Sequence, residues 1–209
     1  MVTADIPYLV SNDADIELIE SLVSAWWKNG RVLEWQAARV PEGIRILALL
    51  PKHDALVAAN NSVYAAKALK ALNARGIEMP KVQILGPEPE SAKQCSCARP
   101  ASLVMFTNYL SKGSPVRCGG CFGPVPLYEL PFTQDFEHLD VLHWAADYRA
   151  CDTLQMHCTT GERFAEAQLG RFDSSLSKQG RGIASRLSAL AGVPVYCFLM
   201  KARGATALD

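Results

Sequence analysis

Residues 95–121 read CSCARPASLVMFTNYLSKGSPVRCGGC, and two close cysteine pairs bracket this stretch. The first pair is Cys95-Ser96-Cys97 and the second is Cys118-Gly119-Gly120-Cys121, with 20 residues between the pairs. Two cysteine pairs at this separation are typical of a zinc ribbon, in which each pair contributes two thiolates to one tetrahedral Zn²⁺. We therefore predict that Cys95, Cys97, Cys118 and Cys121 bind one zinc ion.

The spacers within the two pairs bear on this prediction. Gly119 and Gly120 allow the chain to bend tightly and let backbone N–H groups approach sulfur. The single residue Ser96 is a less common spacer than two, but no histidine close in sequence could replace Cys95. Four thiolates leave no coordination position for water or substrate, so the predicted metal is structural. Zinc contributes roughly 10–16 kcal/mol of apparent binding energy in small peptides, enough to fold a segment too small for its own core.

The residues before the ribbon alternate between short apolar runs and amphipathic stretches, which predicts alternating strands and helices. Asn12 and Ser62 are suitable capping residues for two helices. The resulting order β-α-β-β-α-β is the split βαβ of a ferredoxin-like sheet with both helices on one face. The strands of this sheet are predicted at residues 6–10, 32–40, 44–50 and 82–85.

The fold class is therefore α+β, with three parts along the chain. We predict a ferredoxin-like part at residues 1–90, the zinc ribbon at 91–131, and a helical part at 132–209 that packs on the rest and ends in a strand. Within the ribbon, residues 103–106 are predicted to form a hairpin strand with 125–128 as its partner.

The composition favours a folded protein and disfavours non-specific binding to nucleic acid. Lys+Arg and Asp+Glu both number 21 in 209 residues, and 49% of residues are apolar. A neutral balance disfavours non-specific binding to phosphate, and the apolar fraction suffices for a folded core. The first residues do not resemble a signal peptide, and no apolar run approaches the roughly 18 residues of a membrane span. We predict a cytoplasmic protein whose seven cysteines are metal ligands or buried thiols.

The cysteines outside the two pairs have a spacing that is less specific for a function. Cys151, Leu154 and Cys158 have helical spacing, which favours thiols packed as small apolar side chains. A redox pair, or a nucleophile with His157 as base, is the alternative. No phosphate-binding glycine loop or nucleophile elbow occurs.

Possible partner-binding residues lie outside the ribbon. Between residues 163 and 203 basic side chains outnumber Glu166 and Asp173, which suggests either a solvated helical face or a patch for nucleic acid or an acidic protein. Trp27 falls beside the apolar stripe of its predicted helix and is a candidate exposed aromatic. The partner-binding candidates are Trp27, Lys178, Arg181 and Arg186.

The block from Ser114 to Tyr128, SPVRCGGCFGPVPLY, resembles a bacterial family described as zinc-ribbon-containing, for which nucleic-acid binding is suggested and no activity is established. Residues 148–152, YRACD, and 193–196, VPVY, share the resemblance. It implies zinc at the four cysteines and a non-enzymatic role; Gly120 departs from it, because an acidic residue is expected there. A looser resemblance, tied to no motif, is to immunity proteins against nuclease toxins of type VI secretion.

Three functional hypotheses follow. The first is a non-enzymatic zinc-ribbon protein that docks a partner protein, with a cytosol-acting nuclease toxin as the suggested partner. The second is a nucleic-acid-binding protein that uses the ribbon and residues 163–203. The third is a thiol enzyme at Cys151 or Cys158. We favour the first, because the charge is balanced and the predicted metal is structural.

Overall fold

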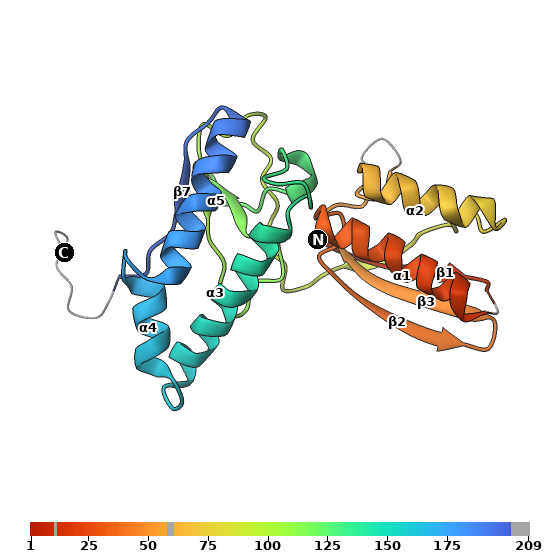
Figure 1. The fold of residues 1–209 in the computed structure, drawn as a ribbon, viewed down its shortest axis with the longest axis horizontal. Coiled ribbons are helices and arrows are strands. Elements are labelled where there is room, and N and C mark those ends of the chain that lie inside the picture. Colours follow the sequence, from red (N-terminus) through yellow and green to blue (C-terminus); the bar gives the residue numbers. More distant parts are fainter. Residues whose placement is uncertain (11, 58–60, 202–209) are drawn as a thin grey trace. The chain divides into compact units, whose positions relative to one another are not determined.

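The computed structural model describes residues 1–10, 12–57 and 61–201, which form two compact units (Figure 1). The N-terminal unit comprises Met1–Gln94 together with the short segments Lys112–Ser114 and Pro126–Glu129. The C-terminal unit comprises Cys95–Ser111, Pro115–Val125 and the described residues from Leu130 onward. The cysteine-rich segment and the C-terminal helices therefore share one unit. No helix in the described ranges is long and apolar enough to span a bilayer.

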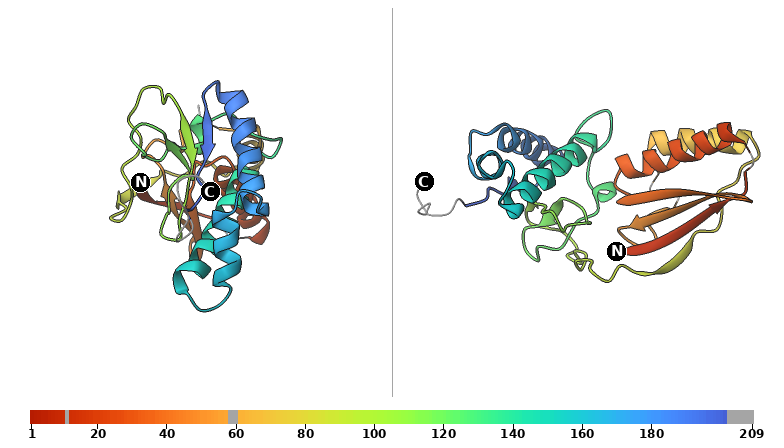
Figure 2. Two further views of the ribbon diagram at one scale, coloured as in Figure 1. Left: turned by 90° about the vertical axis from the view of Figure 1, so that its left-hand side faces the viewer. Right: turned by 90° about the horizontal axis from the view of Figure 1, so that it is seen from below.

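The N-terminal unit is an antiparallel sheet with two helices. Its strands pair in the order β2-β3-β1-β4, and every neighbouring pair is antiparallel. Both helices lie on one face of this sheet (Figure 2), so the predicted order β-α-β-β-α-β and the one-sided helix layer are confirmed. The elements are β1 (Val2–Tyr8), α1 (Asp13–Lys28), β2 (Glu34–Val40), β3 (Gly43–Leu50), α2 (Val63–Ala74) and β4 (Gln83–Pro87).

Local sequence explains both helix starts. The side chain of Asn12 accepts a hydrogen bond from the Asp15 backbone N–H at 2.9 Å, and Ser62 accepts one from Ala65 at 3.3 Å. These caps satisfy backbone donors that have no partner within the helix. The core lies between helices and sheet, where Ile6, Ile46 and other apolar side chains are fully buried.

The predicted boundaries of the first and last strands along the chain were wrong by a few residues. The first strand was predicted at 6–10, but β1 begins at Val2, because it pairs with β3 from Val2 opposite Leu50 to Tyr8 opposite Ile44. The last strand, β4, continues through Pro87, which pairs with Val2. Strand length is fixed by the paired neighbour, which apolar patterning within one segment does not reveal.

The C-terminal unit packs three helices with a small three-stranded sheet. The sheet has the order β6-β5-β7, in which β5 is antiparallel to β6 and parallel to β7. Because β7 comes from the end of the described chain, the cysteine-rich segment is completed by residues far away in sequence. The elements are β5 (Leu103–Met105), β6 (Val116–Cys118), α3 (Leu139–His157), α4 (Glu162–Gly170), α5 (Ser175–Ala191) and β7 (Val195–Cys197).

The predicted hairpin partner of β5 was wrong. Residues 125–128 were expected to pair with 103–106, but β5 pairs with β6 and β7. Val125 donates one hydrogen bond to the Val116 carbonyl, and Leu127–Glu129 forms a 3-10 helix, η2. Pro124 and Pro126 lack the N–H groups that a continuous strand needs, which explains why no strand forms there.

Candidate metal centre

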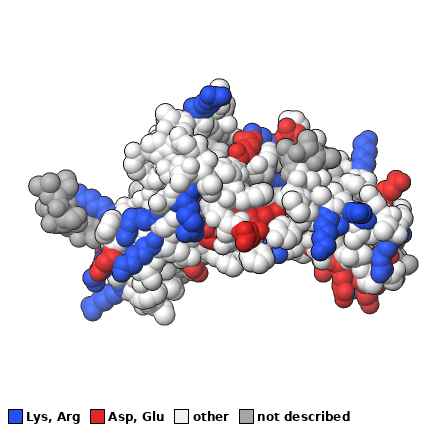
Figure 3. All heavy atoms as spheres, turned by 45° about the horizontal axis from the view of Figure 1, so that its top comes forward, with Lys and Arg blue, Asp and Glu red and all other residues white. Residues whose placement is uncertain are grey.

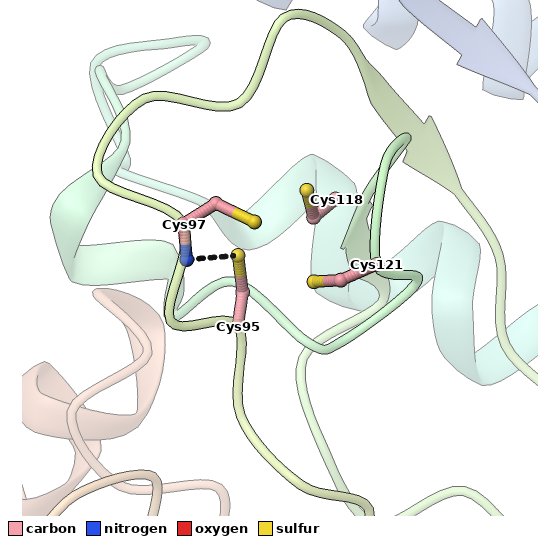
Figure 4. Close-up of side chains that lie close together, drawn as sticks. All are labelled: Cys95, Cys97, Cys118 and Cys121. Atoms are coloured by element: carbon pink, nitrogen blue, oxygen red, sulfur yellow. Dashed lines mark hydrogen bonds between the residues drawn. The ribbon is translucent and has the colours of Figure 1, made fainter.

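The four predicted ligands converge on one point in the C-terminal unit. The Sγ atoms of Cys95, Cys97, Cys118 and Cys121 all lie within 4.8 Å of one another (Figure 4). A tetrahedral ion with metal–sulfur bonds of about 2.3 Å requires sulfur atoms about 3.8 Å apart. A small adjustment of side chains reaches that geometry, so the four cysteines could hold one metal ion.

The second cysteine pair is a tight turn held by backbone hydrogen bonds. Cys118 donates to the Gly123 carbonyl at 2.9 Å, and Phe122 donates to the Cys118 carbonyl at 2.9 Å. Phe122 has a left-handed backbone conformation with φ 58°, which is uncommon for a residue with a Cβ atom. The turn therefore brings Cys121 back towards Cys118 at a conformational cost.

The two glycines of this turn have different roles. A Cβ atom on Gly119 would lie 2.1 Å from the Ser102 Oγ, and the Gly119 N–H donates to the Ser102 carbonyl at 2.8 Å. Gly119 thus allows the turn to approach the segment that leads into β5. A Cβ atom on Gly120 would meet only the Cys118 Sγ at 3.8 Å. Space alone does not require glycine at position 120, which is consistent with the acidic residue expected there.

The surroundings of the sulfur atoms shift their pKa values in different directions. Backbone N–H groups of Cys121 and Gly120 donate to the Cys118 sulfur and lower its pKa to about 7. Burial raises the pKa of Cys95 to about 12, and a side-chain hydrogen bond with Cys121 raises the pKa of Cys97. Without a cation, thiolates this close together are unfavourable. A divalent metal would therefore displace protons from this cluster.

The small sheet that carries Cys118 has side chains buried in the interior of the C-terminal unit. Leu103, Met105 and Val116 are at most 2% exposed, and Cys118 is 1% exposed. Cys95 is tied to the turn by a hydrogen bond from its N–H to the Pro124 carbonyl at 3.0 Å. The candidate centre thus connects the entry into β5 with the end of β6.

The other cysteines do not form a site with these four. Cys151 is buried in α3, and burial raises its pKa. Cys158 is exposed and caps the C-terminus of α3 with φ 54°. The predicted single apolar stripe through Cys151 and Cys158 was therefore wrong, because the helix ends at His157 and the chain leaves helical geometry. A raised thiol pKa also disfavours Cys151 as a nucleophile.

The predicted partner-binding residues lie in both units. Trp27 is half-buried in the N-terminal unit, whereas the three basic candidates belong to α5 of the C-terminal unit. Lys178 is exposed. Arg181 lies over the Phe172 ring at 3.6 Å and donates to the Phe172 carbonyl, and Arg186 pairs with Asp140 at 2.7 Å. Trp27 and the three basic candidates therefore belong to different units.

The basic stretch 163–203 is partly neutralised. Figure 3 shows Lys and Arg side chains gathered on the C-terminal unit with an acidic side chain among them. Arg171 pairs with Asp173 at 3.2 Å, in addition to the pair made by Arg186. Lys201 is exposed, and Arg203 lies outside the described residues. Fewer cations are therefore unpaired than the sequence count indicates.

Sequence patterning missed one residue beside the candidate metal ligands. Arg117 directly precedes Cys118 and is 7% exposed, with its guanidinium 5.9 Å from the centre of the Phe106 ring and 5.8 Å from that of Phe122. Both phenylalanines are present in the quoted stretch or next to it. Their contact with Arg117 depends on strand register, which was predicted wrongly for this segment.

Two family matches cover most of the chain. Residues 97–200 match a domain of unknown function, DUF2310, and residues 5–86 match a second domain of unknown function, DUF8589. The boundary between the two matches, 86 to 97, lies close to the boundary between the two compact units at Gln94.

Two relatives come from Haemophilus influenzae, and both are described as uncharacterized proteins. One is 27% identical over 201 residues, which cover 92% of this chain and 76% of the relative. The other is 31% identical over 129 residues, covering 62% of this chain and 64% of the relative. A Deinococcus radiodurans structure, named provisionally as an antibiotic biosynthesis monooxygenase, is 16% identical and covers 46% of this chain and all of that one. Its TM-score of 0.32 is too low to support an inference.

Proposed function

We propose that this is a non-enzymatic binding protein with one structural Zn²⁺ held by Cys95, Cys97, Cys118 and Cys121. The proposal is based on the site, because the domain matched by residues 97–200, DUF2310, has no known function. The convergence of four Sγ atoms within 4.8 Å carries this proposal. Four sulfur donors around a single ion favour zinc over the harder divalent cations, which prefer oxygen. The strand order β2-β3-β1-β4 of the N-terminal unit supports our proposal that this unit is ferredoxin-like.

A closed coordination shell supports a structural role. Catalytic zinc sites keep a position for water or substrate, whereas four cysteines fill all four positions of a tetrahedron. A metal bound in this way joins the loop of Cys95 and Cys97 to the end of β6. The expected role of the ion is therefore to hold the small sheet in place.

Exposed aromatic side chains on the C-terminal unit support a protein partner. Phe164, Phe172 and Tyr196 are 60% or more exposed, and Phe122 and Phe198 are 40% or more exposed. Large exposed aromatics are enriched at protein interfaces, where they bury much apolar area. That the partner is a nuclease toxin, and that the protein acts in the cytoplasm, stay predictions.

The proposal is tested by metal analysis and partner capture with the full chain. Purified protein should contain one equivalent of zinc by mass spectrometry of the intact protein under native conditions. Zinc-loaded protein should then capture one dominant protein from host lysate, before and after nuclease treatment. The capture should persist in moderate salt, because apolar contacts are screened little. A zinc-free preparation, or capture that disappears with nuclease, contradicts the proposal.

Nucleic-acid binding is the second candidate, favoured by the exposed Lys178 and Lys201. It predicts that binding to an oligonucleotide falls steeply between roughly 50 and 200 mM salt, because phosphate contacts release counterions. The balanced total charge and the paired Arg171 and Arg186 disfavour it.

A further inference from the structure

The small sheet of the C-terminal unit has one buried face and one aromatic face. Arg117, Val104 and Tyr196 lie side by side in register on β6, β5 and β7. Because side chains alternate between faces, Phe106 and Phe198 lie on the same side as Val104 and Tyr196. The aromatic face is defined here as Val104, Phe106, Arg117, Phe122, Tyr196 and Phe198.

The rings of this face form a continuous cluster. The Phe106 ring centre lies 5.2 Å from that of Phe122 and 5.0 Å from that of Phe198. Tyr196 is 60% exposed, Phe122 46% and Phe198 40%. The opposite face is the buried one, with Leu103 and Met105. Several large rings thus face solvent although the sheet already has a core behind it.

Arg117 lies within this cluster with most of its hydrogen-bonding capacity unused. Its Nη2 donates to the Ser111 Oγ at 3.3 Å, and its Nε is buried without a partner. Among the described residues, no carboxylate forms a salt bridge with it. Cation–π contact with Phe106 and Phe122 offsets part of the cost of burying the charge. It does not supply the oxygen acceptors that a guanidinium fork prefers.

Arg31 shows how a buried arginine with a structural role is satisfied in this same protein. It is fully buried in the N-terminal unit. Its Nε donates to the Ala55 carbonyl at 2.5 Å, its Nη2 to the Val57 carbonyl at 2.6 Å, and its Nη1 to the Asn61 side chain. All three guanidinium nitrogens of Arg31 have an oxygen partner, in contrast to those of Arg117.

We propose that the partner docks on the aromatic face and presents to Arg117 a carboxylate flanked by apolar side chains. This inference rests on the proposed function and names the docking site and the chemical group recognised. A carboxylate supplies a charge-assisted acceptor to a cation that lacks one, and it becomes stronger as the rings exclude water around it. The exposed rings of Tyr196, Phe122 and Phe198 supply the apolar contact. An aromatic surface around one cation fits an acidic peptide segment better than a phosphate backbone, which needs several cations.

The test uses random peptides displayed on phage, selected against the full zinc-loaded chain. Peptides enriched on the native protein should carry Asp or Glu between apolar residues. Replacing that acid by its amide, or Arg117 by Gln, should weaken binding by about tenfold or more in calorimetry. Arg117→Lys should recover only part of the affinity, because it keeps the charge without the planar fork. Lys67→Gln, on an exposed residue of α2, is the matched control and should leave binding unchanged.

Tyr196→Ser provides a second variant that does not depend on Arg117. It should weaken the same peptides, and zinc content should stay at one equivalent in every variant compared. Enriched peptides without an acid, unchanged binding by Arg117→Gln and Tyr196→Ser, or no enriched peptide at all would each overturn this docking site. Capture of a protein partner in those cases would leave the proposed function standing. Salt-sensitive binding to oligo-dT with no protein captured would instead overturn the proposed function itself.

Discussion

At the scale of single residues, the turn between Cys118 and Cys121 combines two glycines that differ in the space around them. Gly119 faces the Ser102 side chain and backbone, whereas Gly120 faces open space next to sulfur. The sequence alone does not distinguish the roles of these two glycines, since both could serve a tight turn. Only the approach of residue 102 distinguishes them.

This difference predicts opposite outcomes for two alanine substitutions. Gly119→Ala should destabilise the metal-loaded protein by about 1–3 kcal/mol, because its Cβ atom would overlap the Ser102 Oγ. Gly120→Ala should change stability by less than about 0.5 kcal/mol. Chemical denaturation of both variants with zinc present measures the two effects. Equal losses would show that the turn, not the neighbouring segment, requires glycine.

A second prediction separates ligand cysteines from the others. Cys121→Ser should abolish stoichiometric zinc binding, because a hydroxyl is a poor replacement for a thiolate in a four-sulfur site. Cys158→Ser should retain one zinc and native stability, since Cys158 is exposed at the end of α3. Zinc content after dialysis and thermal melting of the two variants check this. Retention of zinc by Cys121→Ser contradicts the ligand assignment.

The thiol pKa values predict the direction of the pH dependence. In the metal-free cluster the pKa of Cys95 is raised to about 12 and that of Cys97 is also raised. Both thiols are therefore protonated near neutral pH, and zinc must displace at least these two protons. Affinity should fall by at least about a hundredfold per pH unit on acidification, and the stability that zinc confers is present at high pH and lost as pH falls. Competition with a chromophoric chelator across the pH range measures the slope; a pH-independent affinity contradicts it.

At the scale of elements, α5 shows how one helix face is adapted to β7. A Cβ atom at Gly180 would lie 2.6 Å from the Cys197 Sγ and 2.7 Å from the Trp144 Nε1. The glycine thus allows α3, α5 and β7 to approach closely. Gly182, two residues later, has only the flexible end of Arg186 within 4 Å.

These two helical glycines give a matched pair of substitutions. Gly182→Ala should stabilise the protein by about 0.5–1 kcal/mol, because alanine reduces the conformational entropy lost on folding. Gly180→Ala should destabilise it. Overpacking against Trp144 and Cys197 costs about 1–3 kcal/mol, which is more than the entropic stabilisation that alanine brings. Urea denaturation compared with the native chain measures both. Stabilisation by Gly180→Ala would mean that Trp144 and Cys197 move aside readily.

At the scale of the whole molecule, the two compact units are built on different stabilising principles. The N-terminal core consists of aliphatic and aromatic side chains between the sheet and two helices and contains no cysteine. The small sheet of the C-terminal unit is made of strands from two distant segments, and its strand β6 ends at Cys118 of the cysteine cluster. Loss of the metal should therefore affect one unit first.

Removal of zinc should accordingly produce a local rather than a global change. With a strong chelator, amide protons of Leu103–Met105, Val116–Cys118 and Val195–Cys197 should exchange much faster, while those of β1 and β3 keep their protection. Hydrogen exchange with mass spectrometry resolves the segments. Addition of zinc should restore protection. Simultaneous loss of protection in both units would contradict the independence of the N-terminal core.

The sequence by itself determined the ligand set as a prediction, the helix caps at Asn12 and Ser62, and the order β-α-β-β-α-β. These depend on spacing, local hydrogen bonding and periodicity, which are properties of short segments. Only the tertiary structure decided that β7 completes the small sheet, that residues 125–128 do not, and that Arg117 lies next to the rings of both Phe106 and Phe122. Those contacts depend on which distant strand satisfies the backbone of β5, because the free energy of such pairing comes from the partner and not from the segment itself.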